Sequence, residues 1–333
     1  MQKSINNLIE KLIKAFFLLL ERLSSFHITY HLRPKDSNNI SLKDSDVSNV
    51  SDENIAIVIQ GPLITKDNFT LETLKLYLKF FPSCHIFLST WETEEPLLLK
   101  LIEGLGIKVI LNKKPSYSGL SNINFQIIST SQGIIEAKNW NCKYVLKTRT
   151  DQRIYSKNSI NLCYSAIKKF PVLHGYPQKE RIVSFNLNSF KYRLYGLSDM
   201  INFGHIDDMC KYWCVDCDIR THDDIGEAKT LLDFSRQRFA EVYFLTSFLN
   251  NIERPIKWTL EDSWNVIREH FIVLDTSSID LLWKKYTHKE FRHENYKLIH
   301  NTQLNFSDWL IFQNKLPNNI PEHIIKIELD KVN

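Results

Sequence analysis

The chain has 333 residues, of which 43% are hydrophobic and 24% are charged, a balance typical of a globular protein and unlike a disordered chain. Its formal net charge of +4 is too small to indicate a dedicated nucleic-acid binder. The length suffices for one large α/β domain or two small ones.

An amphipathic helix is predicted over residues 5–23, where apolar side chains recur with helical spacing and Lys or Arg occupy several of the other positions. Its longest uninterrupted apolar run, AFFLLL, is far shorter than the ~20 residues that span a bilayer. Such a helix can lie in a membrane surface, and the ordinary alternative is a helix that packs on the protein or on a second copy. No signal peptide is expected, because no small-residue cleavage site follows the run. The sequence therefore predicts a cytoplasmic location, with peripheral contact at the inner face of the cytoplasmic membrane as one option.

The cysteines are expected to be free thiols, as is usual in a reducing compartment. Three of them fall close together, with histidines nearby, which would allow a zinc site. No second closely spaced pair follows, and the same three would also fit one helix as small hydrophobic residues. The residues of this group are Cys210, Cys214, Cys217, His205 and His222.

A polar stretch at residues 35–54, rich in Ser, Asp and Asn, predicts a linker. The folded domain is expected to begin at Ile55 with the apolar run IAIVI, which is typical of a buried parallel strand. Strands and helices then alternate, and this predicts a mostly parallel sheet with helices on both faces. Strands are predicted within residues 55–63, 84–92, 107–115 and 143–151, and helices within residues 70–82, 96–106 and 122–140.

Polar side chains follow the predicted strands where each one ends, and such sheets bind their ligands beyond the carboxyl ends of the strands. The fourth strand ends in Arg149, Asp151 and Arg153, an acid between two arginines that is suited to holding an anion. No GxGxxG follows the first strand and no P-loop motif occurs, so neither a dinucleotide site nor a P-loop is indicated.

Four segments together resemble the WavE family of bacterial lipopolysaccharide-synthesis proteins. They are VIQGPL, FLSTWE, the N-x-N-x-Q stretch at residues 122–126, and LKTRTDQR. The resemblance covers residues 55–155 well and continues through 194–209 and 238–249. It implies an α/β, GT-A-like (Rossmann-related) fold. It also implies a glycosyltransferase that moves a sugar from a nucleotide-sugar donor to a lipid-linked oligosaccharide, as in lipopolysaccharide core, O-antigen or capsule synthesis.

The resemblance also implies where the donor would bind. Asp151 matches the second acid of a D-x-D motif, but Arg149 stands where the first acid should be. One carboxylate with a diphosphate can still hold Mg²⁺ or Mn²⁺; alternatively, Arg149 or Arg153 neutralises the diphosphate directly. Both options stay open. The residues expected on the nucleotide-sugar side are Gln60, Gly61, Pro62, Thr90, Glu92, Asn122, Asn124, Gln126, Arg149 and Arg153.

Removal of the acceptor hydroxyl's proton calls for a carboxylate or an imidazole. Asp199 and Glu241 are the candidates for this base, and Asp151 completes the predicted catalytic set. The ordinary alternatives are a cap or turn role for Asp199 and a favourable interaction with the helix dipole for Glu241.

The predicted organisation is an amphipathic helix with its connection at residues 1–34, a linker at 35–54, the transferase domain at 55–275 and a helical C-terminal extension at 276–333. Aromatic residues alternate with basic ones at residues 283–300, a surface that would suit an anionic lipid-linked acceptor; no nucleic-acid partner is expected. The alternatives are a non-catalytic assembly protein with the same fold and a phosphotransferase-like enzyme of surface-polysaccharide assembly.

Overall fold

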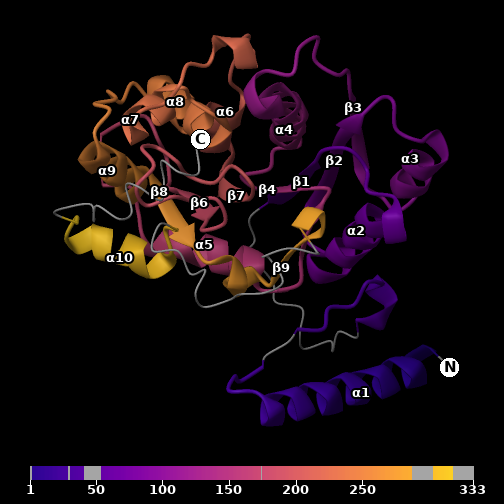
Figure 1. Ribbon diagram of the computed structural model, residues 1–333. Coiled ribbons are helices and arrows are strands. Elements are labelled where there is room, and N and C mark those ends of the chain that lie inside the picture. The colour runs from indigo at the N-terminus through magenta and orange to yellow at the C-terminus, as the bar shows by residue number, and fades with distance from the viewer. Residues whose placement is uncertain (1, 29–30, 41–53, 174, 287–302, 318–333) are drawn as a thin grey trace. The chain divides into compact units, whose positions relative to one another are not determined.

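The computed structural model describes residues 2–28, 31–40, 54–173, 175–286 and 303–317 (Figure 1). The chain divides into two units, Met1–Asp46 and Val47–Asn333. The described elements of the first unit are the helix α1 (Gln2–Leu23) and the short 3-10 helix η1 (Ser37–Asn39). The helix predicted at the N-terminus is therefore present. No helix in the described part of the chain is both long and apolar enough to cross a bilayer.

The second unit is built on a seven-stranded sheet with the strand order β3-β2-β1-β4-β7-β6-β8. Its parallel half consists of β1 (Ile55–Gln60), β2 (His85–Trp91), β3 (Lys108–Asn112) and β4 (Tyr144–Arg149). The strand β7 (Asn202–His205) runs antiparallel between β4 and β6 (Ile182–Phe185), and β8 (Phe271–Leu274) pairs in parallel with β6. The sheet is thus mostly parallel, as predicted.

Helices cover both faces of this sheet. In Figure 1, α4, α6 and α8 lie on one side of it, and α2 and α5 lie on the other. The α/β architecture expected from the sequence, a mostly parallel sheet with helices on both faces, is confirmed in this layered arrangement (Figure 1). The helices are α2 (Phe69–Phe80), α3 (Pro96–Glu103), α4 (Ile123–Asn139), α5 (Ser159–Lys169), α6 (Ile206–Trp213), α7 (Leu231–Arg236), α8 (Ala240–Asn251), α9 (Leu260–His270) and α10 (Phe306–Asn314).

The central strand β1 is buried along its whole length, which explains its continuous apolar sequence. Helix α4 packs directly on it, because Gly133 offers no side chain to hold the helix away. A Cβ at Gly133 would lie 2.4 Å from Cγ1 of Val58, a separation that packed atoms do not tolerate. This close approach brings the N-terminal half of α4 over the parallel strands.

A second, two-stranded sheet joins β5 (Gln152–Ile154) to β9 (Leu281–Trp283) in antiparallel pairing. The C-terminal extension was predicted to be helical. Its described part begins with the short 3-10 helix η6 (Thr276–Ile279) and ends with α10, but between them β9 brings Trp283 back beside Asp151 at the end of β4. Most of the basic aromatic stretch at 283–300 lies outside the described residues, as do residues 41–53 of the predicted linker.

Candidate functional site

The register of the sheet places the end of β4 beside the loop that follows β1. Gln60 is the direct partner of Arg149, and the backbone N–H of Thr150 donates to the carbonyl oxygen of Gln60 at 3.0 Å. Gly61 has a φ of +118°, and a Cβ there would lie 2.9 Å from Oγ1 of Thr150. Glycine is therefore required for the loop at 60–62 to lie this close to β4.

Arg149 and Asp151 form a bidentate ion pair at this strand end. The Arg149 Nε and Nη2 atoms donate to the two Asp151 carboxylate oxygens at 2.9 and 3.1 Å, and the Trp283 indole donates to Oδ2 at 3.0 Å. Burial raises the pKa of Asp151, but the hydrogen bonds and charge of Arg149 outweigh it, so the net pKa is lowered. The Arg149 side chain is 24% exposed, so it presents a fixed positive charge that solvent can reach.

This donor set does not fit a divalent metal. Both carboxylate oxygens of Asp151 already accept from the Arg149 guanidinium, and Arg149 occupies the position at which a D-x-D motif supplies its other acid. In the part of the chain that the structure describes, no three His, Cys, Asp or Glu side chains gather closely enough to hold a metal ion. Mg²⁺ and Mn²⁺ prefer several oxygen ligands, and here the two oxygens of Asp151 are bound to a guanidinium.

Arg153 does not belong to this strand end, and its predicted role is corrected. Its side chain is buried under α2, where Nε donates to Oγ1 of Thr73 and Nη2 donates to the carbonyl oxygen of Phe69, both at 2.8 Å. The guanidinium also lies 4.4 Å from the centroid of the Phe69 ring. Arg153 therefore holds the first turn of α2 against β5.

Asp199 lies in a cluster that sequence reasoning found only in part. The Gln126 amide on α4 donates to Oδ2 of Asp199 at 2.7 Å. The Lys147 ammonium on β4 donates to the carbonyl oxygens of Asp199 and Met200 at 2.6 and 3.2 Å and lies 4.2 Å from the centroid of the Trp213 ring. Two predicted site residues, Asp199 and Gln126, are thus brought into direct contact.

Lys147 itself was missed. Burial lowers its pKa to about 7, although the charge of Asp199 opposes that shift. The signal in the sequence was a lysine inside an otherwise apolar strand, since Lys, when buried, is almost always paired. Its ammonium fixes the backbone of the segment that presents the Asp199 carboxylate.

Glu241 lies in the first turn of α8, as predicted, within electrostatic reach of Asp199. Burial and the charge of Asp199 raise the pKa of Glu241 to about 7, and Arg193 opposes the shift. The buried hydroxyl of Tyr212, which has no hydrogen-bond partner among the described residues, feels the charge of both carboxylates. The two candidate bases therefore belong to one cluster.

Several other residues predicted on the nucleotide-sugar side follow the ends of β1 and β2. Gln60 is buried and accepts a hydrogen bond from Ser129 on α4 at 2.7 Å. The Thr90 hydroxyl donates to Oε1 of Glu94 at 3.3 Å, and the backbone N–H of Leu63 donates to the same oxygen at 3.2 Å. Glu94 thus joins the ends of β1 and β2, a role the sequence did not reveal. Pro62, Glu92 and Asn122 are exposed.

Asn124 has a structural role instead of the predicted sugar contact. Its Nδ2 donates to the carbonyl oxygen of Asp218 at 2.8 Å, and its Oδ1 accepts from the Asp218 backbone N–H at 2.7 Å. The amide is also buried, so it is not available to a ligand. This part of the prediction is corrected.

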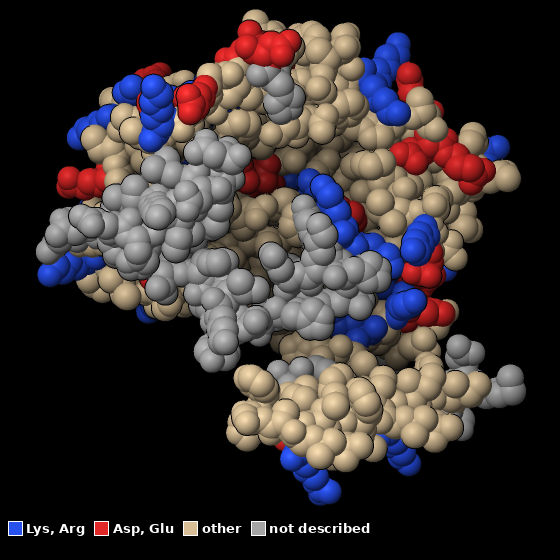
Figure 2. Space-filling view, viewed as in Figure 1, with Lys and Arg blue, Asp and Glu red and all other residues tan. Residues whose placement is uncertain are grey.

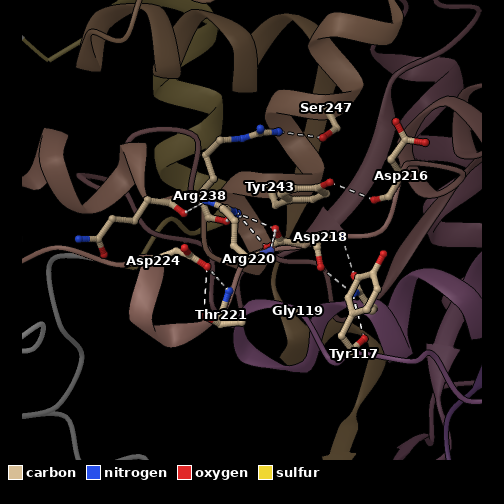
Figure 3. Close-up of polar contacts among 12 residues, drawn as sticks. Tyr117, Gly119, Asp216, Asp218, Arg220, Thr221, Asp224, Arg238, Tyr243 and Ser247 are labelled. Carbon is tan, nitrogen blue, oxygen red and sulfur yellow. Dashed lines mark hydrogen bonds and ion pairs between the residues drawn. The ribbon is translucent and has the colours of Figure 1, made fainter.

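The polar network around Asp218 ties together the helices that carry the candidate residues (Figure 3). Arg220 makes a bidentate ion pair with Asp218 at 2.8 and 2.9 Å, and the Tyr243 hydroxyl on α8 donates to the carbonyl oxygen of Asp216 at 3.0 Å. Since Asn124 holds the same segment to α4, the network fixes α8 with its Glu241 relative to α4 with its Gln126.

Figure 2 shows a hollow on one face of the second unit, over the region that Figure 1 labels β1, β4 and β7. Acidic and basic side chains both border it. Fold and site together define an α/β protein with a cluster of charged side chains beyond the carboxyl ends of a mostly parallel sheet, the place where such sheets bind their ligands.

Residues 55–253 match the family model described as WavE lipopolysaccharide synthesis. The match spans more than half of the chain, and the chain belongs to this family. The family resemblance seen in the sequence is confirmed.

Comparison with curated proteins finds no match. Among solved structures, the chain is similar to a glycosyltransferase involved in glycosylation of the major capsid of PBCV-1, with 14% identity over 47% of this chain and 61% of that one, at a TM-score of 0.27. It is also similar to TarS of S. aureus, with 12% identity over 65% and 63% of the chains at a TM-score of 0.31. It is similar as well to a cytidylyltransferase from Leptospira borgpetersenii, with 13% identity over 60% of this chain and 93% of that one, at a TM-score of 0.31. The chain covers less than two thirds of the first two proteins, and TM-scores this low carry no argument about function.

Proposed function

We propose that the protein is a glycosyltransferase of surface-polysaccharide assembly. In this proposal it moves a sugar from a nucleotide-sugar donor to a lipopolysaccharide core, O-antigen or capsule acceptor. Membership of a lipopolysaccharide-synthesis family supports the pathway. The observation that carries the reaction class is a fixed, partly exposed cation, Arg149, at the end of β4, together with two interacting carboxylates, Asp199 and Glu241. Arg149 and Asp199 both act electrostatically on Lys147 of the same strand.

Sugar transfer places negative charge on the departing nucleoside diphosphate. Arg149 is suited to neutralise this charge, because Asp151 and Trp283 hold its guanidinium in place before the donor binds. A preorganised charge of this kind costs no reorganisation at the moment of reaction, and such electrostatic stabilisation is usually the largest single contribution. Asp151 acts through Arg149 and is thus a positioning residue. Because the donor set does not fit a metal, the proposal needs none.

The acceptor hydroxyl must lose a proton as it attacks. Glu241 suits this role, because a base is most effective when its pKa lies close to the working pH, and burial together with Asp199 raises the pKa of Glu241 to about 7. Asp199, fixed by Gln126 and by the Lys147 contact to its backbone, supplies the neighbouring negative charge. A phosphotransferase-like enzyme or a binding protein would need Arg149 but not this pair of carboxylates.

The proposed acceptor is lipid-linked, and α1 offers a means to reach it. Its apolar face is exposed along the helix, with Leu12 61%, Phe16 57% and Leu23 77% exposed. The helix carries four basic and two acidic side chains, a balance that favours an anionic lipid surface. We therefore place the protein at the inner face of the cytoplasmic membrane, held peripherally by α1.

Thermal melting with a panel of nucleoside diphosphates and nucleotide sugars tests the donor site. A ligand that binds only the folded state raises the Tm, by an amount set by its concentration relative to Kd. We expect at least one nucleotide to raise the Tm of the native protein and to lose this effect in Arg149→Gln. Exposed Lys113→Met is the matched control and should keep the shift. A shift that is unchanged in Arg149→Gln, or no shift with any nucleotide, would refute the proposal.

A further inference from the structure

An arginine on the loop between β6 and β7 is held between two aromatic rings. The guanidinium carbon of Arg193 lies 3.8 Å from the centroid of the Phe190 ring and 4.8 Å from the centroid of the Phe234 ring. Phe190 belongs to the same loop and Phe234 belongs to α7, so two separate segments of the chain hold this side chain. All three residues are half-buried. A guanidinium that stacks on rings keeps its N–H groups at its edge, where they bind acceptors.

Gly196 makes room for this arginine. The loop folds back on itself, since the backbone N–H of Gly196 donates to the carbonyl oxygen of Arg193 at 3.1 Å, and that of Phe190 donates to the carbonyl oxygen of Gly196 at 2.9 Å. A Cβ at Gly196 would lie 2.9 Å from both Cγ and Cδ of Arg193. These atoms form the inner part of the side chain, so a larger residue would displace the guanidinium with them. The loop is thus built around one position of Arg193.

A stack of rings continues from Arg193 toward the candidate base Glu241. The rings of Phe234 and Phe239 stack with their centroids 5.1 Å apart and their planes 28° apart. Phe239 directly precedes α8, and Glu241 lies in the first turn of that helix. Burial and the charge of Asp199 raise the pKa of Glu241, and the charge of Arg193 opposes them. A group bound at Arg193 would therefore lie on the side of the site where the proposed base meets its acceptor.

Arg193 is fixed in a different way from Arg149. Arg149 is paired with the carboxylate of Asp151 at the end of β4, whereas Arg193 is stacked on rings from another part of the chain. In the proposed reaction Arg149 neutralises the diphosphate of the donor. The second fixed cation, beside Glu241, is then left for an anionic group of the other substrate.

We propose that Arg193, with Phe239 beside it, forms a subsite for an acidic sugar of the acceptor, one that carries a carboxylate or a phosphate group. A guanidinium binds either group through two parallel hydrogen bonds, and aromatic side chains supply the apolar surface that lines most ligand sites. The inference rests on the proposed function, because that function defines the acceptor. Arg193 is a specificity-determining residue in this subsite, since it selects the acceptor and takes no part in bond formation.

Ligand-observed NMR titrations of the full chain with three monosaccharides test the subsite. Glucuronate differs from glucose only at C6, where a carboxylate replaces a hydroxymethyl group, and glucose 6-phosphate carries a phosphate at the same carbon. We expect the native protein to bind at least one of the two acidic sugars about tenfold more tightly than glucose, because hydrogen bonds to a charged group are the stronger ones. The tighter of the two identifies the acidic group of the acceptor as carboxylate or phosphate.

Four variants separate a binding role of Arg193 from a structural one. Arg193→Gln should bring the affinity for the acidic sugar down to about that for glucose. Arg193→Lys should keep part of the preference, because an ammonium lacks the planar fork of a guanidinium. Gly196→Ala keeps the charge but displaces it, and it should also reduce the preference. Arg268→Gln removes the same charge from α9 and is the matched control, which should bind as the native protein does.

The nucleotide-induced rise in Tm distinguishes failure of this inference from failure of the proposed function. If no nucleotide raises the Tm, the proposed function fails. If a nucleotide raises the Tm but the native protein shows no preference for either acidic sugar over glucose, the acceptor subsite alone fails.

Two further outcomes would overturn the subsite. One is a preference for the acidic sugar that survives in Arg193→Gln. The other is a preference that is lost in Arg149→Gln and kept in Arg193→Gln, which would place the anion on the donor side. Circular dichroism checks the fold of each variant. If Arg193→Gln does not fold, the native preference in both Arg193→Lys and Gly196→Ala would refute the subsite equally.

Discussion

The Gln126 amide donates a hydrogen bond to the Asp199 carboxylate across 2.7 Å, and this contact joins helix α4 to the segment that enters β7. It places a fixed negative charge in front of Glu241, and that charge contributes to the raised pKa of Glu241. Asp199 is thus held in place by Gln126, and Glu241, with its pKa raised to about 7, can exchange a proton near neutral pH.

Glu241→Gln should abolish transfer while making the protein more stable at alkaline pH. The folded-state pKa of Glu241, about 7, lies above its ordinary value of 4.5. Between these two pKa values the folded state binds more protons than the unfolded chain. The stability associated with Glu241 is therefore present below about pH 4.5 and is lost as the pH rises through about 7. We expect the variant to gain on the order of 2 kcal/mol at pH 8 relative to pH 5, compared with the native protein.

Urea unfolding at the two pH values measures this difference, and Glu253→Gln on the surface is the matched control. Native transfer activity should also fall as the pH is lowered through about 7, where Glu241 takes up its proton. Full activity in Glu241→Gln would remove it from the proposed base role.

Removal of divalent metal should leave both nucleotide binding and transfer unchanged. In the proposed mechanism Arg149 supplies the positive charge that a metal would otherwise supply, and Asp151 is already bound to Arg149 through both of its carboxylate oxygens. Activity measured with and without a chelator, after dialysis against it, checks the expectation; a hundredfold loss restored by Mn²⁺ would contradict it.

Asp151→Asn should reduce transfer by a factor of about 10² or more, because the Arg149 guanidinium loses its charged anchor. The fold should be intact by circular dichroism. The nucleotide-induced rise in Tm should shrink but not vanish, since Arg149 itself remains. Unchanged kcat and an unchanged Tm shift in this variant would exclude Asp151 from the site.

Lys147→Met should remove a component of the pH dependence of stability. The folded-state pKa of Lys147, about 7, lies below its ordinary value of 10.5. Between these values the unfolded chain binds more protons, so the stability of the native protein rises with pH across this window. The variant should lack this rise and should be destabilised by about 1–3 kcal/mol, because two carbonyl groups lose their donor. Chemical unfolding from about pH 7 to 10 measures the free energy of unfolding and its pH dependence, with Lys113→Met as the control. The same pH dependence in Lys147→Met and in the native protein would count against a lowered pKa of Lys147.

Leu12→Glu should weaken binding to vesicles of phosphatidylethanolamine and phosphatidylglycerol. Leu12 lies on the apolar face of α1, and a buried carboxylate there would be costly. Leu18 is also exposed, but it lies about 120° from Leu12 around the helix, outside the apolar face. Leu18→Glu is therefore the matched control. Co-sedimentation measures the bound fraction. Equal loss of binding in both variants would contradict membrane contact, and so would the absence of binding by both the native protein and the control. If the native protein is a dimer in solution that Leu12→Glu dissociates, the apolar face of α1 binds a second copy instead.

The sequence predicted the parallel half of the sheet well, because IAIVI is a continuous apolar run ended by Gly61-Pro62 and strand-like segments then alternate with helical ones. The short strands were harder: β7 reads NFGH, and β9 has three residues, too few to show a period. Their pairing is decided by contacts between segments far apart in the chain.

The same limit applies to the site. Arg149 and Asp151 could be placed, since a strand end fixes where its last residues lie. Arg153 could not, because the chain turns after Asp151 and β5 carries it under α2. The roles of Lys147 and Gln126 could not be predicted either, because both depend on contacts with Asp199, which lies more than fifty positions from Lys147 in the sequence.

The family match ends at residue 253, yet Trp283 supplies an indole to Asp151, and β8 pairs with β6 at the edge of the sheet. A polypeptide trimmed to the matching segment would keep the ionic pair but lose its aromatic neighbour, and it would leave the backbone of β6 open to association with other chains. Relatives that share the matching segment but diverge after it would therefore be expected to differ in how tightly they hold this arginine, and through it in donor preference.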